Sequence, residues 1–545
     1  MNIRNVNLEI GLKVSLLLLA VFLLYSQSLH TPLFFDDPEE IKDFAGRGQS
    51  YFNFDRRWLA DATFGWTVRW LGYDLAWLRL GNISLHAANV VALFLLLRHL
   101  FGITRSNAPS LDEMSASPHW LAFFGALLFA LHPVAVYGVG YLIQRSTLMA
   151  TLFVLLMLLS YLRGLLRGGW HWMVIAVLCY FLALYSKEHS IAAPAVALAL
   201  TFLVRKPSLG LVRQISPYYF LCALSAASML YITHKMGLIA NAYEPNGAGI
   251  AELFAIRQGA VIGNQPITAT PNLFLLSLLT QSGLFFKYLL LWVIPNPAWM
   301  SIDMREPFAV SYWGWRTLSL LCFIGYFCVA VWLLLKQGRR GLLGLAMLFP
   351  WLLFLTEVST VRAQEPFVLY RSYLWMPGLM IALPLLFAGL APKRAYLLLG
   401  ILAILLIPLS LNRLHSFSSG LLLWNDAEKL VRDKHDMPGV ERIYAIRANE
   451  FVLLERYSEA VEDFTTAIKV YPRYDFLYCD RATAKYMLGK YQAALMDYNR
   501  ALSLNVDNPI CYTGRAQAQL ALGNFAAARL DFEKSCALGL CKSGQ

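Results

Sequence analysis

Long apolar runs separated by short polar stretches fill the chain from its start to about residue 411. The first run, Val14–Phe35, is uncharged. Eleven more follow it: Leu80–Leu100, Trp120–Tyr141, Thr147–Leu162, Trp170–Tyr185, Ile191–Val204, Tyr218–Thr233, Phe274–Ile294, Thr317–Leu335, Leu342–Leu355, Tyr373–Leu390 and Ala395–Leu411. A helix crosses a bilayer in roughly 20 residues at 1.5 Å each. The pattern predicts an all-α fold with a polytopic bundle of membrane helices.

Charges between the runs predict the topology. With the N-terminus in the cytoplasm, Arg163–Arg167 and Arg205–Arg213 fall inside, as the positive-inside rule expects. A full crossing by Phe274–Ile294 would then put Lys336–Arg340 outside, against the rule. The polar centre Gln281–Gly283 instead favours a re-entrant segment or a broken pair of half-helices. We therefore predict about 11 spans plus one irregular segment, and the chain after residue 411 lies outside.

A 34-residue period replaces the apolar runs from about Pro438. Arginine, aromatic, alanine and aspartate positions recur in register: Arg447, Arg481 and Arg515; Tyr457, Tyr491 and Phe525; Ala460, Ala494 and Ala528; Asp463, Asp497 and Asp531. This period and these residue types are typical of tetratricopeptide repeats, and three copies suffice for a stable stack. The predicted domains are a transmembrane domain at 1–415 with outer loops at 30–78 and 235–273, a linker at 416–437, and an α-solenoid at 438–545.

Composition agrees with a membrane protein, since 58% of the residues are hydrophobic and 15% are charged, against about 25% charged in soluble domains. The net charge of +12 is explained by cationic cytoplasmic loops, and no nucleic-acid-binding motif accompanies it. A cleaved signal peptide is the alternative to the first span. The run is too long for its apolar region, so we favour an uncleaved helix.

Eight cysteines divide evenly between the two predicted domains. Those of the apolar runs are expected to be packing residues: Cys179, Cys222, Cys322 and Cys328. The other four lie in the repeats, where an extracytoplasmic location would allow disulfides. The plausible pairs are Cys479 with Cys511, across neighbouring repeats, and Cys536 with Cys541. No set of residues has the spacing of a metal site.

Candidate chemistry begins at Asp36 and Asp37, directly after the first apolar run. Carboxylates are costly beside lipid, so such a pair usually has a task, although it could simply cap a helix starting at Pro38. On the predicted topology other polar residues at outer span ends share its side: His132, Arg145, Lys187, Glu188, His189, Arg362, Glu365 and Arg371. Each has a structural alternative, such as helix capping, local pairing or anchoring at the interface. Together they suit an anionic, phosphate-bearing substrate.

The stretch Tyr51–Arg79 is rich in aromatic residues with interspersed charges. It is expected to form amphipathic helices in the outer interface, where they could hold a lipid-linked substrate beside Asp36 and Asp37. The alternative is a simple belt of interfacial aromatic residues.

An acidic pair after the first span, followed by interfacial helices, resembles the GT-C superfamily of membrane glycosyltransferases. Three segments resemble its transmembrane and tetratricopeptide repeat (TMTC-like) branch: Leu131–Val136 with Gln144–Ser146, Ser186–Glu188 with Pro194, and Tyr370–Pro377. The last reads Tyr-Leu-Trp-Met-Pro where that branch has Tyr-Leu-Pro. The resemblance implies O-glycosyl transfer from a polyprenyl-phosphate sugar, and protein O-mannosylation in the eukaryotic members. Three repeats suggest a bacterial relative in the inner membrane, with active site and repeats in the periplasm.

An inverting transfer needs a general base for the acceptor hydroxyl and positive charge on the departing phosphate. Asp36 or Asp37 is the predicted base, with a slight preference for Asp37. The predicted phosphate ligands are Arg145, Lys187, Arg371, His132 and His189, supported by Glu188 and Glu365. A divalent cation beside the acidic pair is conceivable, but the cations could do its electrostatic work.

The repeats are expected to bind an acceptor protein or an assembly partner. Other functions stay open at this stage: transfer to an envelope lipid or glycan, a non-enzymatic membrane-anchored scaffold, and a flippase or transporter. The last would place charges at the bilayer midplane, where these runs have almost none.

Overall fold

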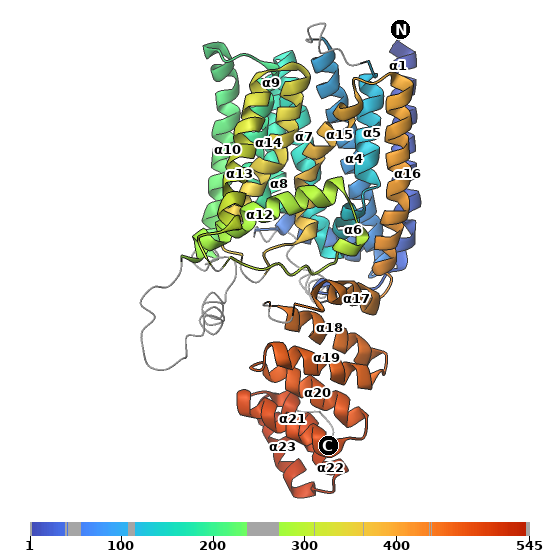
Figure 1. Cartoon of the computed structure of the whole chain (residues 1–545), viewed down its shortest axis with the longest axis vertical. Helices are drawn as coiled ribbons and strands as arrows, with labels where there is room; N and C mark the ends of the chain where they lie inside the picture. The colour runs from blue at the N-terminus through green and yellow to red at the C-terminus, as the bar shows by residue number, and fades with distance from the viewer. Residues whose placement is uncertain are drawn as a thin grey trace. The chain divides into compact units, whose positions relative to one another are not determined.

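The computed structural model describes residues 3–38, 41, 56–106, 115–236, 272–309, 311–362, 365–434, 437 and 439–540. Every regular element of these residues is a helix (Figure 1), which confirms the predicted all-α fold. The chain forms two compact units. The first contains 1–299 and Phe308–Ser418, and the second contains Met300–Pro307 and everything from Ser419.

The first unit holds the apolar helices. Its elements are α1 (Ile3–Tyr25), η1 (Ser26–His30), α3 (Trp58–Leu71), α4 (Leu75–Ser106), α5 (Pro118–Ala130), α6 (Pro133–Gly140), η3 (Leu142–Gln144), α7 (Arg145–Arg167), α8 (Trp170–Ser186), η4 (Glu188–Ala192), α9 (Ala193–Val204), α10 (Leu209–Lys235), α12 (Leu273–Val293), η5 (Pro297–Trp299), α13 (Trp315–Leu335), α14 (Gly338–Val358), η6 (Leu369–Leu374), η7 (Met376–Gly378), α15 (Leu379–Phe387) and α16 (Pro392–Ser416).

Within the described residues, eight helices are long and apolar enough to cross a membrane, and a ninth span results if α5 and α6 are counted as one. Three shorter apolar helices follow the same pattern, at Trp170–Ser186, Glu188–Val204 and Met376–Phe387. Each of the twelve apolar runs predicted from the sequence therefore overlaps with one or more helices. Much of the predicted outer loops, namely 39–40, 42–55 and 237–271, lies outside the described residues.

Helix α12 corresponds to the irregular segment of the sequence prediction. It is one continuous helix from Leu273 to Val293, so the predicted broken pair of half-helices is wrong. Figure 1 shows α12 crosswise to α10, α13, α14 and α16, whose axes run in roughly the same direction. Two buried polar side chains of α12 bind residues that follow α14: Ser277 donates to the Thr360 carbonyl at 3.2 Å, and Gln281 of the polar centre donates to the Pro366 carbonyl at 2.8 Å.

The α5–α6 span is bent by 58° at Leu131–His132. Pro133 occupies the first turn of α6 and supplies no N–H, so the chain can restart a helix there but cannot continue the previous one. The side chain of His132 caps the new helix by accepting from the Val134 amide at 3.2 Å. The break turns α6 against α16 and η6.

Short 3-10 elements connect the ends of the long helices that meet at the Asp36–Asp37 end of the first unit. Element η1 packs on α4, η4 packs on α8 and α14, and η6 packs on α6 and α7. Residues far apart in the sequence therefore come together where these connections meet. This is the region that brings the candidate site together.

The second unit is a tetratricopeptide-like stack of helices: α17 (Gly420–Val431), α18 (Val440–Leu453), α19 (Tyr457–Val470), α20 (Asp475–Met487), α21 (Tyr491–Leu504), α22 (Pro509–Ala521) and α23 (Phe525–Ala537). The predicted repeats are the pairs α18–α19, α20–α21 and α22–α23. In each pair an arginine of the first helix donates from Nε to an aspartate of the second: Arg447 to Asp463 at 2.6 Å, Arg481 to Asp497 at 2.8 Å and Arg515 to Asp531 at 2.7 Å. The recurring arginines and aspartates of the sequence are thus ion pairs within each repeat.

Two features of the second unit were not predicted. The linker prediction covered 416–437, but Gly420–Val431 forms α17. The segment Met300–Pro307 also joins this unit, through buried Asp303. That carboxylate accepts from Arg442 of α18 at 2.7 Å and from Arg305 at 2.6 Å.

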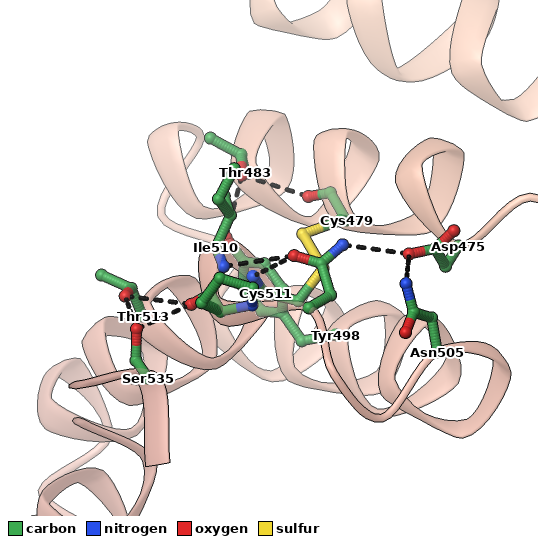
Figure 2. Close-up of a disulfide and its surroundings, with 11 residues drawn as sticks. Asp475, Cys479, Thr483, Tyr498, Asn505, Ile510, Cys511, Thr513 and Ser535 are labelled. Carbon is green, nitrogen blue, oxygen red and sulfur yellow. Dashed lines mark hydrogen bonds between the residues drawn. A yellow bond between two sulfur atoms is a disulfide. The ribbon is translucent and has the colours of Figure 1, made fainter. Parts of the chain in front are cut away.

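A disulfide joins Cys479 of α20 to Cys511 of α22, with Cα atoms 5.6 Å apart (Figure 2), and confirms that predicted pair. Beside it Asn508 caps α22, accepting from the amides of Ile510 and Cys511, and donates to Asp475 at 3.0 Å. The bridge therefore ties the first helices of two neighbouring repeats together. Cys541 of the second predicted pair lies outside the described residues.

Alkylation of the unfolded chain tests this bridge. Without reductant Cys479 and Cys511 are expected to stay unmodified, whereas Cys179, Cys222, Cys322 and Cys328, which are free, react in both conditions. Equal labelling of Cys479 and Cys511 with and without reductant would contradict the bridge. Replacing both by serine is expected to lower the free energy of unfolding of the repeats by about 3 kcal/mol, because the unfolded chain regains the entropy of an open loop.

Candidate functional site

The acidic pair lies in a tight turn, residues 34–37, which we call the Asp turn. The Asp37 amide donates to the Phe34 carbonyl at 2.9 Å, and the Asp37 side chain accepts from the Phe34 amide at 3.3 Å. Phe35 has a left-handed φ of 57°. That conformation is unfavourable for a bulky residue and persists only where the surroundings enforce it, often at functional sites.

The two carboxylates of the turn have opposite environments. Asp37 is 0% exposed, and its Oδ1 accepts from the Ile143 amide at 3.0 Å. Asp36 is exposed, and its Oδ2 accepts from the Tyr141 hydroxyl at 3.0 Å. Asp37 therefore anchors the turn to the η3 segment, and Asp36 is the carboxylate that an incoming molecule can reach.

Arg79 of α4 holds the segment that leads into the Asp turn. Its guanidinium is buried and donates to the carbonyls of Thr31 and Gly140, both at 2.9 Å, and also to the carbonyl of Pro32. These acceptors belong to the segment leading into the Asp turn and to the end of α6. The sequence prediction assigned Arg79 no role and placed it just before the apolar run Leu80–Leu100, whereas the structure includes it in the long apolar helix α4, where a charged residue usually has a function.

Burial raises the pKa of Asp37 to about 6, and hydrogen bonds from Ile143 and Phe34 and the charge of Arg79 offset this only in part. The unfolded value is about 3.9. The folded chain therefore binds a proton more tightly than the unfolded chain, so this group's contribution to stability falls as the pH rises from about 4 to about 6.

This pKa predicts a pH effect on stability. We expect the wild type to lose stability relative to Asp37→Asn as the pH rises from about 4 to 7, by roughly 3 kcal/mol at 1.4 kcal/mol per unit. Melting temperatures of both proteins in detergent across this range measure it. Asp36→Asn is the control and should keep the wild-type slope. Parallel profiles for wild type and Asp37→Asn would show that Asp37 does not titrate there.

Arg145 starts α7 and is buried. Its Nη2 donates to the Leu78 carbonyl at 2.6 Å and its Nε to Asn82 at 3.0 Å. The guanidinium lies 3.8 Å from the centre of the Phe64 ring. A Cβ on Gly81 would come within 2.9 Å of Nη2, so the glycine makes room for it. Arg145 is thus enclosed by its own chain, and its predicted role at phosphate stays a prediction.

Lys187 is buried where α8 ends. Its ammonium donates to Gln144 at 3.0 Å and to Thr147 at 2.7 Å, and it lies 5.9 Å from the centre of the Tyr370 ring. Burial, followed by the positive charge of Arg57, holds the pKa of Lys187 well below its usual value. A phosphate nearby would favour the charged form and raise this pKa again.

A network of charged side chains continues from Lys187; we call it the charge network. Its first half centres on Glu188, which accepts from Arg57 at 2.7 and 3.0 Å and lies 3.6 Å from Arg56. His189 Nδ1 is 3.7 Å from the same carboxylate. Both arginines immediately precede α3, so Glu188 ties the start of that helix to the end of α8.

The second half of the charge network centres on Glu357, a buried residue of α14. Its carboxylate lies 2.8 Å from Arg362 Nε, 3.3 Å from Arg371 Nη1 and 3.2 Å from His189 Nε2. Arg371 Nη2 lies 3.6 Å from Glu365. The sequence prediction missed Glu357, which lies two residues after the apolar run Leu342–Leu355 and is the one acidic residue of α14; acidic residues at such positions usually have a function.

Among the residues that the structure describes, the charge network contains four arginines and three glutamates. These described members sum to a net positive charge, before Lys187 is counted. The Tyr370 ring, next to Arg371, packs on the Tyr141 ring with centroids 5.5 Å apart, and Tyr141 binds Asp36. The structure thus brings the Asp turn, Lys187 and the charge network to one region.

His132 is not part of this network. It is buried and stacks on Trp292 with ring centroids 4.5 Å apart. Its Nε2 lies 3.0 Å from the Trp292 carbonyl, and its Nδ1 caps α6. His132 therefore caps a helix at a kink, which was the structural alternative for this residue. Its contacts give no support to the prediction that it binds phosphate. Among the described residues, no three His, Cys, Asp or Glu side chains group as metal ligands.

Comparison with known proteins adds little to this geometry. No protein-family model and no curated protein matches the chain. Among solved structures it is similar to the first TPR of Spaghetti (RPAP3) bound to HSP90 peptide SRMEEVD, with 26% identity over 19% of this chain and 82% of that one, TM-score 0.19. For MamA MSR-1 C2 the identity is 16%, the coverage 23% and 75%, and the TM-score 0.20. For APC/C hetero-tetramer Cut9–Hcn1 the identity is 12% over 93% of this chain and 90% of that one, and the TM-score is 0.22. Since all three scores are low, the repeat assignment rests on the helix pairs described above.

Proposed function

We propose that this protein is a membrane glycosyltransferase that moves a sugar from a polyprenyl-phosphate donor to a hydroxyl acceptor on the extracytoplasmic side. The observation that carries the proposal is the exposed carboxylate of Asp36, which is linked through Tyr141 and the Tyr370 ring to a largely buried network whose described members sum to a net positive charge. A carboxylate can take the acceptor's proton, and the cations can stabilise the departing phosphate.

In this mechanism Asp36 takes the base role rather than Asp37. The acceptor oxygen attacks the anomeric carbon, its proton passes to Asp36, and the bond from that carbon to the phosphate oxygen breaks. The phosphate leaves as an anion and needs no proton, so one carboxylate suffices. Asp37 is fully buried and accepts from two backbone amides, so we assign it the part of holding the turn that presents Asp36.

The leaving phosphate would lie against Arg371 and Lys187. Arginine gives phosphate two parallel charged hydrogen bonds. Glu188 and Glu357 keep the surrounding arginines and His189 in fixed orientations, which lets the donor bind to a preorganised site. The cations can supply the electrostatic stabilisation by themselves, and a divalent cation beside the Asp turn stays a prediction.

We place the protein in a bacterial plasma membrane, with the Asp turn and the repeats in the periplasm. The Cys479–Cys511 bridge supports this, because disulfides persist in oxidising compartments and are rare in the cytosol. Three tetratricopeptide-like repeats suit the binding of an extended peptide, so we propose an acceptor protein as their ligand.

Glycoproteomics of envelope proteins tests the proposal. Cells lacking the chain should lose a set of O-linked glycans that the wild-type protein restores. A variant without 438–545 should still bind the donor but transfer poorly to protein. An unchanged glycoproteome together with altered lipid-linked glycans would favour transfer to lipid or glycan, and no change in either would favour the scaffold.

A further inference from the structure

The guanidinium of Arg371 is held between two carboxylates in different environments. Its Nη1 faces Glu357, whose side chain is 1% exposed, at 3.3 Å. Its Nη2 faces Glu365, whose side chain is 29% exposed, at 3.6 Å. Arg371 itself is 11% exposed. One side of this arginine therefore points into the protein, and the other lies close to solvent.

The inner carboxylate is fixed. Glu357 belongs to helix α14 and also contacts Arg362 and His189, at 2.8 and 3.2 Å. Moving it would weaken its ion pairs with two largely buried arginines, Arg362 and Arg371, which is strongly unfavourable. Glu357 thus sets the plane in which Arg371 presents its outer nitrogen, and it acts as a positioning residue.

The ion pair between Arg371 and the outer carboxylate is weaker than the pair with Glu357. Glu365 lies in the connection before η6, and the 3.6 Å separation is an ion-pair distance beyond that of a good hydrogen bond. A partly exposed pair of this kind contributes little free energy. A phosphate can offer the same nitrogen shorter, charge-assisted hydrogen bonds.

We propose that Glu365 is a placeholder for the donor phosphate: it neutralises the outer side of Arg371 in the empty enzyme and is displaced when a polyprenyl phosphate binds. This inference rests on the proposed function for the identity of the phosphate. While the site is empty, Glu365 keeps the outer side of a nearly buried arginine paired. A ligand must compete with this carboxylate for Arg371, which only an anionic head group can do. A neutral polyprenol has no charge with which to displace it.

The test measures binding of a polyprenyl phosphate to the full-length protein in nanodiscs, without any sugar or acceptor. Glu365→Gln is expected to bind the lipid about two- to fivefold more tightly than the wild type, because the competing ion pair is gone. Its affinity for the neutral polyprenol of the same length should not change. Inorganic phosphate serves as a competitor. Weak competition identifies the lipid as ligand, and competition as strong as by the lipid would contradict a lipid-phosphate site.

Glu357→Gln is the matched variant, since it also removes one negative charge from a carboxylate that faces the Arg371 guanidinium. If orientation matters, it should bind the phospholipid at least tenfold more weakly. Tighter binding by both variants would mean that only net charge counts and would overturn the placeholder. Unchanged or weaker binding by Glu365→Gln would overturn it as well, and a melting curve shows whether that variant is folded.

These outcomes separate the inference from the proposed function. Tighter phosphate binding by Glu365→Gln in a protein that transfers no sugar would leave the placeholder standing and remove the glycosyltransferase. Sugar transfer by the wild type, with no effect of Glu365→Gln on affinity, would do the reverse.

Discussion

Replacing Asp36 by asparagine is expected to lower the rate of sugar transfer by about 10²- to 10⁴-fold, the usual contribution of a general base. The amide keeps the size of the side chain and can still accept from the Tyr141 hydroxyl, but it cannot take up the acceptor's proton. Binding of the polyprenyl-phosphate donor should stay the same, because Asp36 is not among the residues proposed to hold the phosphate. Transfer assays and donor binding on purified protein measure the two effects separately.

Two variants make this result specific. Asp74→Asn changes another exposed aspartate, one that caps the start of α4 through the Ala76 amide, and should leave transfer unchanged. Asp37→Asn should act through the turn, so it should alter the pH dependence of stability. Full transfer activity in both Asp36→Asn and Asp37→Asn would end the assignment of the base to this turn.

Replacing Arg79 by leucine is expected to lower the free energy of unfolding by about 3–5 kcal/mol and to abolish transfer. The substitution leaves three carbonyl groups without their donor: those of Thr31 and Gly140, which are buried, and that of Pro32, which is partly buried. Each unsatisfied buried acceptor costs about 1–3 kcal/mol, although relaxation of the loop recovers part of it. Asp37 also loses the positive charge that partly offsets its burial.

Thermal unfolding in detergent measures the stability, and the matched control is Arg69→Leu, which changes an exposed arginine of α3. The control should shift the melting temperature by no more than a typical surface substitution. If Arg79→Leu has the same melting temperature as the control and still transfers sugar, then Arg79 does not hold the Asp turn.

The helices of both units could be predicted from the sequence because their signals are local. An apolar run about 20 residues long has few alternatives to a membrane helix, and the 34-residue period repeats the same ion pair, such as Arg447 with Asp463, in each copy. The addition of Met300–Pro307 to the second unit could not be predicted, since it depends on Arg442, which is 139 residues from Asp303.

The candidate site was predictable only as a set of residue types. Asp36 could not be distinguished from Asp37 in advance, because the difference arises from the left-handed Phe35 and from the amide of Ile143, 106 residues after Asp37. His132 and Arg145 have the residue types of phosphate ligands, yet their donors are taken by Trp292, Leu78 and Asn82. Such details follow from packing between distant segments, which no local pattern records.

Arg79 also bears on the order of events during synthesis. Two of its acceptors, in Thr31 and Pro32, precede it in the chain, but the third, in Gly140, is made 61 residues later. An unpaired arginine in a membrane helix is costly, so on the proposed topology the nascent chain carries an incompletely satisfied cation until the α5–α6 span has been inserted. The acidic turn can then become rigid only at that moment, before the ribosome has made either Glu357 or the repeats.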